Sequence, residues 1–268
     1  MNRGSLLFQA IQFAEEAAQN IMMVRERGYA ITVKLDGSLV TDADRISQDI
    51  IVSGLRKATP DIPVIAEEST IQTPAPTPPT VVPSSFWLVD PLDGTREFVD
   101  GRDEFVVNIG LVQNHRAILG AVAVPALNEL YFAVVGKGAW KCVDGRVDPI
   151  HTRMAPPYGL VVLISRFCAS DARLEAILGG QRVAKRIRMG SGLKLCRLAE
   201  GNADLYPRPG RTMEWDTAGP QAVVEAAGGR VETWDSRQLT YGKPNWKNPP
   251  FICSGSRSQP LFGDEGTD

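Results

Sequence analysis

The chain has few of the residues on which most metal sites and nucleophilic sites depend. Its 268 residues include two histidines, His115 and His151, and four cysteines. Two histidines far apart in the sequence disfavour a Ser–His–Asp triad and a histidine-rich metal site. The cysteines form no Cys-x-x-Cys pair, which disfavours a zinc site and a disulfide framework and agrees with a reducing compartment. If the chain is an enzyme, carboxylates are therefore expected to perform its chemistry.

Long apolar runs and an excess of one charge are also missing. No apolar run approaches the roughly 20 residues that span a bilayer. No signal-peptide core follows the N-terminus, because Gln9, Gln12 and Glu15 interrupt it. The 29 basic and 31 acidic residues give a formal charge of −2, so no overall field attracts nucleic acid polymers or acidic membranes. We expect a cytoplasmic protein, monomer or homodimer, that acts on a small molecule.

Apolar periodicity divides the chain into two parts. It predicts helices over residues 5–27 and 42–57, the first capped by Ser5, and then short strands with tight turns between residues 86 and 143. Beyond residue 150, helices and strands alternate as in α/β units. We therefore expect residues 1–150 to form a helix pair with a mostly antiparallel sheet, and residues 151–268 to form an α/β subdomain. The proline-rich stretch 71–85 is expected to be a surface loop, or alternatively a mobile flap.

The strongest functional signal is the stretch Asp90–Thr95, with the sequence Asp-Pro-Leu-Asp-Gly-Thr after a short apolar strand. We expect Pro91 to end the ladder and Gly94 to allow a sharp turn, so that Asp90 and Asp93 face one point. The Leu92 carbonyl adds a hard oxygen ligand, and this donor set favours Mg²⁺ over zinc. Haloacid dehalogenase-type phosphatases also carry aspartates after a strand, but with a shorter spacing, which disfavours an aspartyl-phosphate enzyme here.

Further acidic residues fall where the expected helices begin or strands end: Asp42, Asp44, Glu67, Glu68 and Asp216. Each has an ordinary explanation, because glutamate pairs are usually solvated and aspartates commonly cap helices. Together with Asp90 and Asp93 they supply enough oxygen ligands for two to three Mg²⁺ ions.

The order of these motifs is recognisable. The stretches Ala66–Ser69, Asp90–Thr95 and Trp215–Asp216 resemble the inositol monophosphatase superfamily of Mg²⁺-dependent, lithium-sensitive phosphomonoesterases, over residues 5–255. Within it the chain is most similar to the CysQ-type 3'(2'),5'-bisphosphate nucleotidases, which convert 3'-phosphoadenosine 5'-phosphate to AMP. The stretches that carry this closer resemblance are Asp93–Phe98, Glu104–Ile109, Gly190–Lys194, Ala199–Tyr206 and Thr212–Ala218. The resemblance implies a five-layer α-β-α-β-α sandwich with the metal site between the two halves.

The resemblance also implies a role for each site residue. Glu67, Asp90 and the Leu92 carbonyl would hold one Mg²⁺; Asp90, Asp93 and Asp216 would hold a second; Glu67 would help to hold a weaker third. The catalytic residues would be Asp44 and Thr95, which orient and activate the nucleophilic water, together with Glu67. The substrate would contact Leu92, Asp93, Gly94, Thr95, Ser191, Lys194, Arg208 and Asp216.

The chain departs from the family pattern in several places. Ala66, Gly192 and Gly219–Pro220 differ from the usual residues, and Phe167 and Cys168 replace the end of a Ser-Arg-Ser-His stretch that helps to hold the nucleotide. An inositol monophosphatase, or another small sugar-phosphate phosphatase of the superfamily, is therefore the alternative. A non-catalytic metal or nucleotide sensor is a remote one.

Overall fold

The outer layer of the fold is a pair of long helices, seen in a computed structural model that describes residues 2–72, 82–167 and 171–256. The first helix, α1, spans Arg3–Arg27. The Asn2 side chain accepts a hydrogen bond from the Ser5 amide at 2.8 Å. Asn2, and not Ser5 as predicted, is therefore the cap, because Ser5 already lies in the first turn.

The second helix, α2 (Asp42–Ala58), packs along α1. It begins as predicted after Thr41, which forms a capping box with Asp44. A methyl group added to Gly54 would lie 2.4 Å from the Phe13 ring of α1, so glycine allows a close contact between the helices. The capping box fixes Asp44 at the end of α2 that faces the site described below.

A seven-stranded sheet forms the second layer, in the order β3-β4-β5-β6-β7-β8-β9. β3 and β4 are parallel and the other pairs are antiparallel, so the predicted meander is present. α1 packs on β5 and β6, and α2 packs on β4. The strands are β3 (Val64–Ala66), β4 (Ser85–Asp93), β5 (Val106–Gln113), β6 (Arg116–Val124), β7 (Glu129–Val134), β8 (Gly138–Val143) and β9 (Arg146–Ile150).

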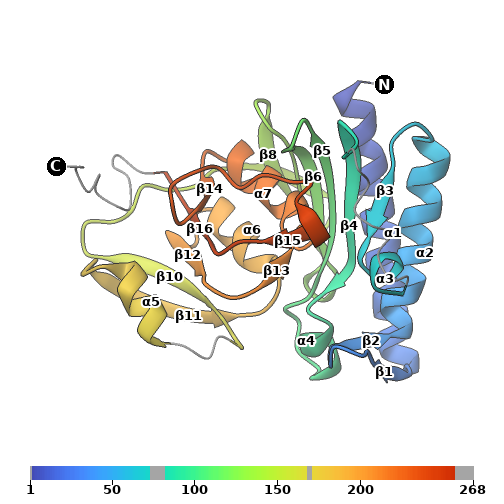
Figure 1. The fold of residues 1–268 in the computed structure, drawn as a ribbon, viewed down its shortest axis with the longest axis horizontal. Helices are drawn as coiled ribbons and strands as arrows, with labels where there is room; N and C mark the ends of the chain where they lie inside the picture. The colour runs from blue at the N-terminus through green and yellow to red at the C-terminus, as the bar shows by residue number, and fades with distance from the viewer. Residues whose placement is uncertain (1, 73–81, 168–170, 257–268) are drawn as a thin grey trace.

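The middle layer consists of α6 (Leu193–Ala199) and α7 (Ala218–Ala226) (Figure 1). α7 lies directly on the seven-stranded sheet through glycines. A methyl group added to Gly110 would lie 2.5 Å from the Gly219 nitrogen, and one added to Gly120 would lie 2.3 Å from the Gly219 oxygen. This contact holds the start of α7, and with it the segment that carries Asp216, against the strands.

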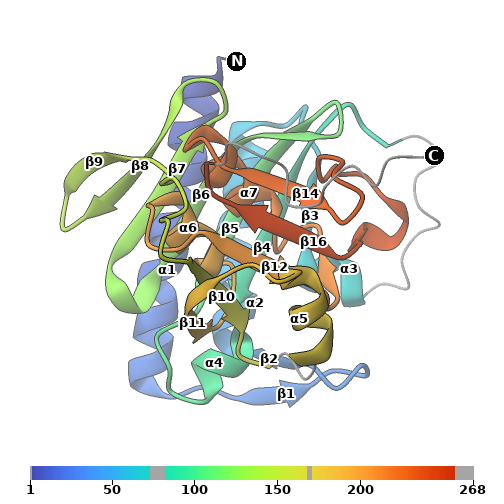
Figure 2. The ribbon, with the colours of Figure 1, turned by 90° about the vertical axis from the view of Figure 1, so that its left-hand side faces the viewer.

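A five-stranded sheet forms the fourth layer, in the order β11-β10-β12-β16-β14, and α5 (Asp171–Leu178) covers its outer face (Figures 1 and 2). Leu174 and Ile177 of α5 pack into an apolar cluster with Leu160 and Val162. The expected five-layer sandwich is thus confirmed. The strands are β10 (Leu160–Ser165), β11 (Val183–Met189), β12 (Leu205–Arg208), β14 (Arg230–Thr233) and β16 (Phe251–Ser254).

Short elements connect these layers. They are β1 (Ile31–Val33), β2 (Leu39–Thr41), α3 (Glu67–Gln72), α4 (Thr95–Val99), η1 (Pro125–Leu127), β13 (Thr212–Met213), η2 (Pro244–Trp246) and β15 (Lys247–Asn248). The prediction that Pro91 ends the ladder is wrong. Asp90 pairs with Asn108 and Asp93 pairs with Val106, so the ladder resumes after a bulge. Proline lacks an N–H, and the bulge accommodates it without ending the strand.

Parts of the prediction stay untested. Residues 73–81 of the proline-rich stretch, Cys168 and the tail from residue 257 lie outside the described residues. The division near residue 150 remains a prediction: one sheet ends at Ile150 and the other begins at Leu160, but α7 packs against strands of both. Among the described helices, none combines the length and apolarity needed to cross a membrane.

Candidate active site

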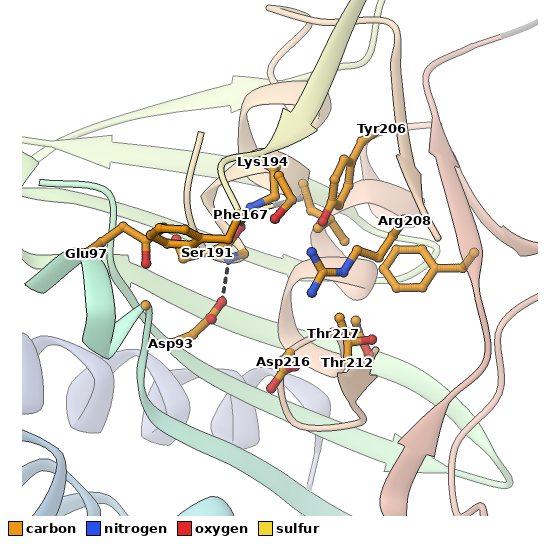
Figure 3. A pocket seen from close by; sticks show the side chains of 15 residues that line it. Asp93, Glu97, Phe167, Ser191, Lys194, Tyr206, Arg208, Thr212, Asp216 and Thr217 are labelled. Atoms are coloured by element: carbon orange, nitrogen blue, oxygen red, sulfur yellow. Dashed lines mark hydrogen bonds between the residues drawn. The ribbon is translucent and has the colours of Figure 1, made fainter. Parts of the chain in front are cut away.

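A cleft of about 210 Å³ lies where the ends of β4, β10 and β12 meet the start of α6. It gathers predicted residues that are far apart in the sequence (Figure 3). The predicted residues that line it are Asp93, Gly94, Ser191, Lys194, Arg208 and Asp216. Asp90, Leu92 and Thr95 belong to the same β4–α4 segment as Asp93. Asp44 is linked to that segment through Thr95, whereas Glu67 contacts Lys34 and acts on Asp90 and Asp216 through its charge.

The β4 bulge presents two aspartates. Asp90 is buried and accepts a hydrogen bond from the Leu92 amide at 3.1 Å. Asp93 accepts one from the Gly192 amide, which joins the end of β4 to the segment before α6. A methyl group added to Gly94 would lie 3.1 Å from the Glu104 carbonyl oxygen, and the φ of Gly94 is +95°. Both facts favour glycine at this turn.

Asp44 and Thr95 are brought together as predicted. The single proton of the Thr95 hydroxyl has two acceptors within reach, the Asp44 carboxylate at 2.9 Å and the Leu92 carbonyl at 3.2 Å, and the shorter distance favours Asp44. The second Asp44 oxygen accepts from the Thr41 amide at 2.7 Å and from its hydroxyl at 2.6 Å. Burial raises the pKa of Asp44, although these hydrogen bonds oppose that shift.

Glu67, the first residue of α3, is paired with a lysine from the β1–β2 hairpin. The Lys34 ammonium lies 3.2 Å from Glu67 and 2.6 Å from Glu68. Burial raises the pKa of Glu67 to about 7, and the Lys34 charge opposes this shift. The positive charge of Lys34 therefore neutralises part of the acidic cluster.

Asp216 lies just before α7, and the Met213 amide donates to its carboxylate at 2.8 Å. It does not open a helix as predicted, because Thr217 is the cap and α7 starts at Ala218. Burial raises the pKa values of Asp90 and Asp216 well above the ordinary range. The negative charges of Glu67 and Asp93 raise both pKa values further.

These carboxylates are not arranged as a ready-made metal site. Within residues 2–72, 82–167 and 171–256, no three acidic, histidine or cysteine side chains converge closely enough to hold an ion. Glu67, Asp93 and Asp216 instead hold protein partners. The negative charges of Glu67 and Asp93 nevertheless raise the pKa values of Asp90 and Asp216, and a divalent cation would offset this repulsion. The carboxylate and carbonyl oxygens present are donors of the kind that a hard cation such as Mg²⁺ prefers.

The opposite wall of the cleft is cationic. Lys194 is buried and donates to the Met189 carbonyl at 3.3 Å and to the Ser191 carbonyl. Burial lowers its pKa to about 8, with the Arg208 charge acting in the same direction and Asp93 opposing. The Arg208 guanidinium donates to the Arg211 carbonyl at 2.8 Å, while its buried Nε has no partner among the described residues. Two cations that face one cleft favour an anionic ligand.

Comparisons with known proteins agree with this geometry. Residues 3–256 match the Inositol monophosphatase family. The chain belongs to this family. It is 42% identical to the 3'(2'),5'-bisphosphate nucleotidase CysQ of Escherichia coli O157:H7 over 256 residues, which cover 93% of this chain and 99% of that protein.

Solved structures of the inositol monophosphatase family share the fold. A crystal structure of CysQ from Bacteroides thetaiotaomicron aligns with a TM-score of 0.81 at 33% identity, covering 95% of this chain and 98% of that one. The inositol monophosphatase from Anabaena (Nostoc) sp. PCC 7120 aligns with a TM-score of 0.74 at 22% identity, covering 96% and 92%. Family members are phosphatases that depend on metal ions, so the predicted family and fold are confirmed.

Three residues at this family site were missed from the sequence or were given no role. Lys34 pairs with Glu67 and Glu68. Glu97 is buried and lines the cleft. Glu104 accepts from the Gly190 amide at 2.9 Å and from Arg166, which joins the two sheets. The sequence around Lys34 gives no signal for this pairing, because its two partners lie 33 and 34 residues away in the chain.

Proposed function

We propose that this chain is a Mg²⁺-dependent 3'(2'),5'-bisphosphate nucleotidase, which hydrolyses the 3'-phosphate of 3'-phosphoadenosine 5'-phosphate to give AMP and inorganic phosphate. The relative from Escherichia coli O157:H7 carries this activity in its name, and the alignment covers nearly all of both chains. The substrate in this proposal is a small phosphorylated molecule in solution.

The observation that carries the proposal is the charge arrangement across one cleft. Asp93 and Asp216 lie on one side, and Lys194 and Arg208 lie on the other (Figure 3). A substrate with one phosphate needs only the first side, together with bound cations. A second, cationic side, on which the buried Arg208 Nε has no partner within the described part of the chain, fits a substrate with two separated phosphates.

The residues that would hold Mg²⁺ are Glu67, Asp90, Asp93, Asp216 and the Leu92 carbonyl, for two to three ions. When bound, these ions neutralise phosphate charge and favour ionisation of the attacking water. Each proposed ligand oxygen belongs to a group that is buried or half-buried, which keeps bulk water from competing for it. We assign the 5'-phosphate to Lys194 and Arg208, with Ser191 beside them.

Asp44 and Thr95 are proposed to orient the attacking water. Because the Thr95 hydroxyl donates its proton to Asp44, its oxygen is free to accept a hydrogen bond from a water molecule. That bond would aim a water lone pair away from Thr95 and towards the phosphorus. The backbone amides of Gly94 and Thr95 are proposed to donate to the phosphate oxygens, which stabilises the charge that develops there.

The test is phosphate release by the purified protein with Mg²⁺, measured with 3'-phosphoadenosine 5'-phosphate, inositol 1-phosphate and fructose 1,6-bisphosphate, each with and without lithium. We expect clear preference for the nucleotide, inhibition by lithium and loss of release after chelation. Preference for a sugar phosphate would support the proposed phosphatase activity but contradict the proposal that the cleft binds a nucleotide. No release from any of the three would overturn the proposal and favour the sensor.

A further inference from the structure

One buried amide side chain contacts two of the segments that carry proposed Mg²⁺ ligands. Asn108 lies on β5, is fully buried and pairs with Asp90 across the β4–β5 ladder. Its Nδ2 donates a long hydrogen bond, of 3.5 Å, to the Asp216 carbonyl oxygen. Desolvation raises the pKa of Asp93, and a hydrogen bond from the Asn108 side chain opposes this shift. The amide therefore joins the end of β4 to the segment before α7.

Both hydrogen bonds can form at the same time. The amide nitrogen of an asparagine carries two protons, so one can be donated to the Asp93 carboxylate and the other to the Asp216 carbonyl. A hydrogen bond that lowers the pKa of a carboxyl favours its ionised form, the form that binds a cation. Asn108 thus acts on the charge of one proposed ligand and on the backbone of another.

The other end of the amide is not explained by packing. The Asn108 Oδ1 is buried and has no hydrogen-bond partner in the part of the chain that the structure describes. A buried oxygen without a partner is costly, and an apolar side chain would avoid that cost. A methyl group added to Gly192 would lie 3.3 Å from this oxygen and 3.2 Å from an Asp93 carboxylate oxygen. Gly192 lines the cleft, so Asn108 reaches a point directly behind that lining.

The strand around Asn108 is otherwise apolar where it is buried. Seven of the eight residues of β5 are buried. Because side chains alternate along a strand, Val106, Gly110 and Val112 share the face of Asn108. This is the face on which α7 packs through the close approach of Gly110 to Gly219. A strand buried on both faces favours apolar residues throughout, so the single amide opposite Asp90 needs a reason other than the fold.

We propose that Asn108 is a positioning residue that holds Asp93 and the Asp216 segment in the arrangement that binds Mg²⁺. This inference rests on the proposed function and deepens it by naming a side chain that sets the geometry of the ligands. Carboxylates that bind metal ions are themselves hydrogen-bonded, and the loss of such a partner lowers metal affinity or activity by about 10- to 100-fold. Asn108 does not line the cleft itself, so its effect on the reaction passes through the two aspartates.

The experiment compares Asn108→Leu, which removes both donated hydrogen bonds, with Asn108→Thr, which keeps one hydroxyl donor. The control is Thr59→Val at the far end of α2, where the buried Thr59 hydroxyl donates to the Leu55 carbonyl and accepts from the Trp87 indole. Titration calorimetry without substrate measures Mg²⁺ affinity, and thermal unfolding in chelator measures stability. Steady-state kinetics give the Mg²⁺ concentration at half-maximal rate.

We expect Asn108→Leu to weaken Mg²⁺ binding by about 10- to 100-fold and to raise the half-maximal Mg²⁺ concentration by a similar factor. Asn108→Thr should weaken binding less, because it restores one donor. Thr59→Val should lower the unfolding temperature through its lost hydrogen bonds and leave Mg²⁺ affinity unchanged, since distant sites act independently.

The outcomes separate the two claims. If the unmodified protein binds Mg²⁺ and hydrolyses the nucleotide while Asn108→Leu keeps its Mg²⁺ affinity, the positioning role is overturned and the nucleotidase stands. An equal loss of affinity in Thr59→Val would also overturn it, because lost stability would then explain the effect. If Asn108→Leu does not fold, Asn108→Thr decides, and an affinity equal to that of the unmodified protein overturns the role. If the unmodified protein neither binds Mg²⁺ nor hydrolyses the nucleotide, the proposed function itself fails.

Discussion

The Thr95 hydroxyl donates a hydrogen bond to Asp44 over 2.9 Å, and this bond joins residues 51 positions apart. Thr95 opens α4 and Asp44 lies in the first turn of α2, so the pair connects the outer helix layer to the end of β4. Each residue has a further hydrogen-bond partner: Thr41 donates to Asp44, and the Leu92 carbonyl lies within hydrogen-bond distance of the Thr95 hydroxyl. The pair is therefore pre-positioned before any ligand arrives.

Removal of the Thr95 hydroxyl is expected to slow turnover without unfolding the protein. Thr95→Val keeps the shape but cannot orient water, so kcat should fall by about 100-fold or more, the usual contribution of positioned acid–base groups. Thr95→Ser keeps the hydroxyl and should retain most of the activity. Steady-state kinetics and thermal unfolding of both variants provide the check. Equal kcat values for the valine and serine variants would contradict the role of the hydroxyl.

Asp216→Asn is expected to stabilise the metal-free protein and, at the same time, to weaken its binding of Mg²⁺. Desolvation and the neighbouring Asp93 and Glu67 charges raise the pKa of Asp216 well above the ordinary range, so replacing the carboxyl with a neutral amide should stabilise the metal-free protein near pH 8. The stabilisation gained on adding Mg²⁺ should shrink at the same time, because one proposed ligand is lost. Thermal unfolding with chelator and with Mg²⁺ measures both effects. An undiminished Mg²⁺ shift in this variant would remove Asp216 from the ligand set.

The metal-free protein is expected to become less stable as pH rises through about 7. The pKa of Glu67 is about 7 in the fold and 4.5 in its ordinary state. Between these values the folded chain holds a proton that the unfolded chain has released. The contribution of Glu67 to the free energy of unfolding is therefore complete below pH 4.5 and is lost as pH rises through about 7. Asp90 and Asp216 act in the same direction.

Unfolding midpoints in chelator across this pH range test the Glu67 contribution, with Glu67→Gln as the matched variant. The glutamine cannot titrate, so its stability should depend less steeply on pH. A slope in Glu67→Gln as steep as in the unmodified protein would show that other groups produce the effect.

Lys194→Met is expected to weaken binding of the second phosphate. The buried ammonium faces the cleft with Arg208, and loss of a charge-assisted contact of this kind costs about 1.5–3 kcal/mol. KM for 3'-phosphoadenosine 5'-phosphate should therefore rise by about 10- to 150-fold, and KM for adenosine 3'-phosphate, which lacks the second phosphate, should change much less. Lys185→Met, at an exposed lysine of β11, is the control. Equal changes for both substrates would contradict the assignment of Lys194 to the 5'-phosphate.

The sequence alone predicted those site residues whose positions depend on neighbouring residues in the chain. Apolar periodicity located the strand that delivers Asp90, and the capping pattern located Asp44, because each signal depends on neighbours in the chain. The boundaries shifted where tertiary contacts compete with local preference. α7 starts at Ala218, next to Gly219, which lies directly on the sheet, and β4 continues past Pro91 through a bulge.

Long-range partners could not be predicted from the sequence. Nothing near Lys34 indicates that its ammonium lies against Glu67 and Glu68, since the pairing depends on how the β1–β2 hairpin folds over α3. The cation–π contact of Arg96 with Phe167 likewise joins α4 to the segment after β10, two elements that lie far apart in the sequence. The fold and the carboxylates thus followed from local patterns and resemblance, while the pairing of charges required coordinates.

The most direct test of the central claim is the identity of the nucleotide formed from 3'-phosphoadenosine 5'-phosphate in the presence of Mg²⁺, determined by chromatography against standards. If Asp93 and Asp216 face the reacting phosphate while Lys194 and Arg208 hold the other, the product is adenosine 5'-phosphate with equimolar inorganic phosphate. Formation of adenosine 3'-phosphate would reverse the two phosphate positions and contradict the proposed arrangement of the cleft.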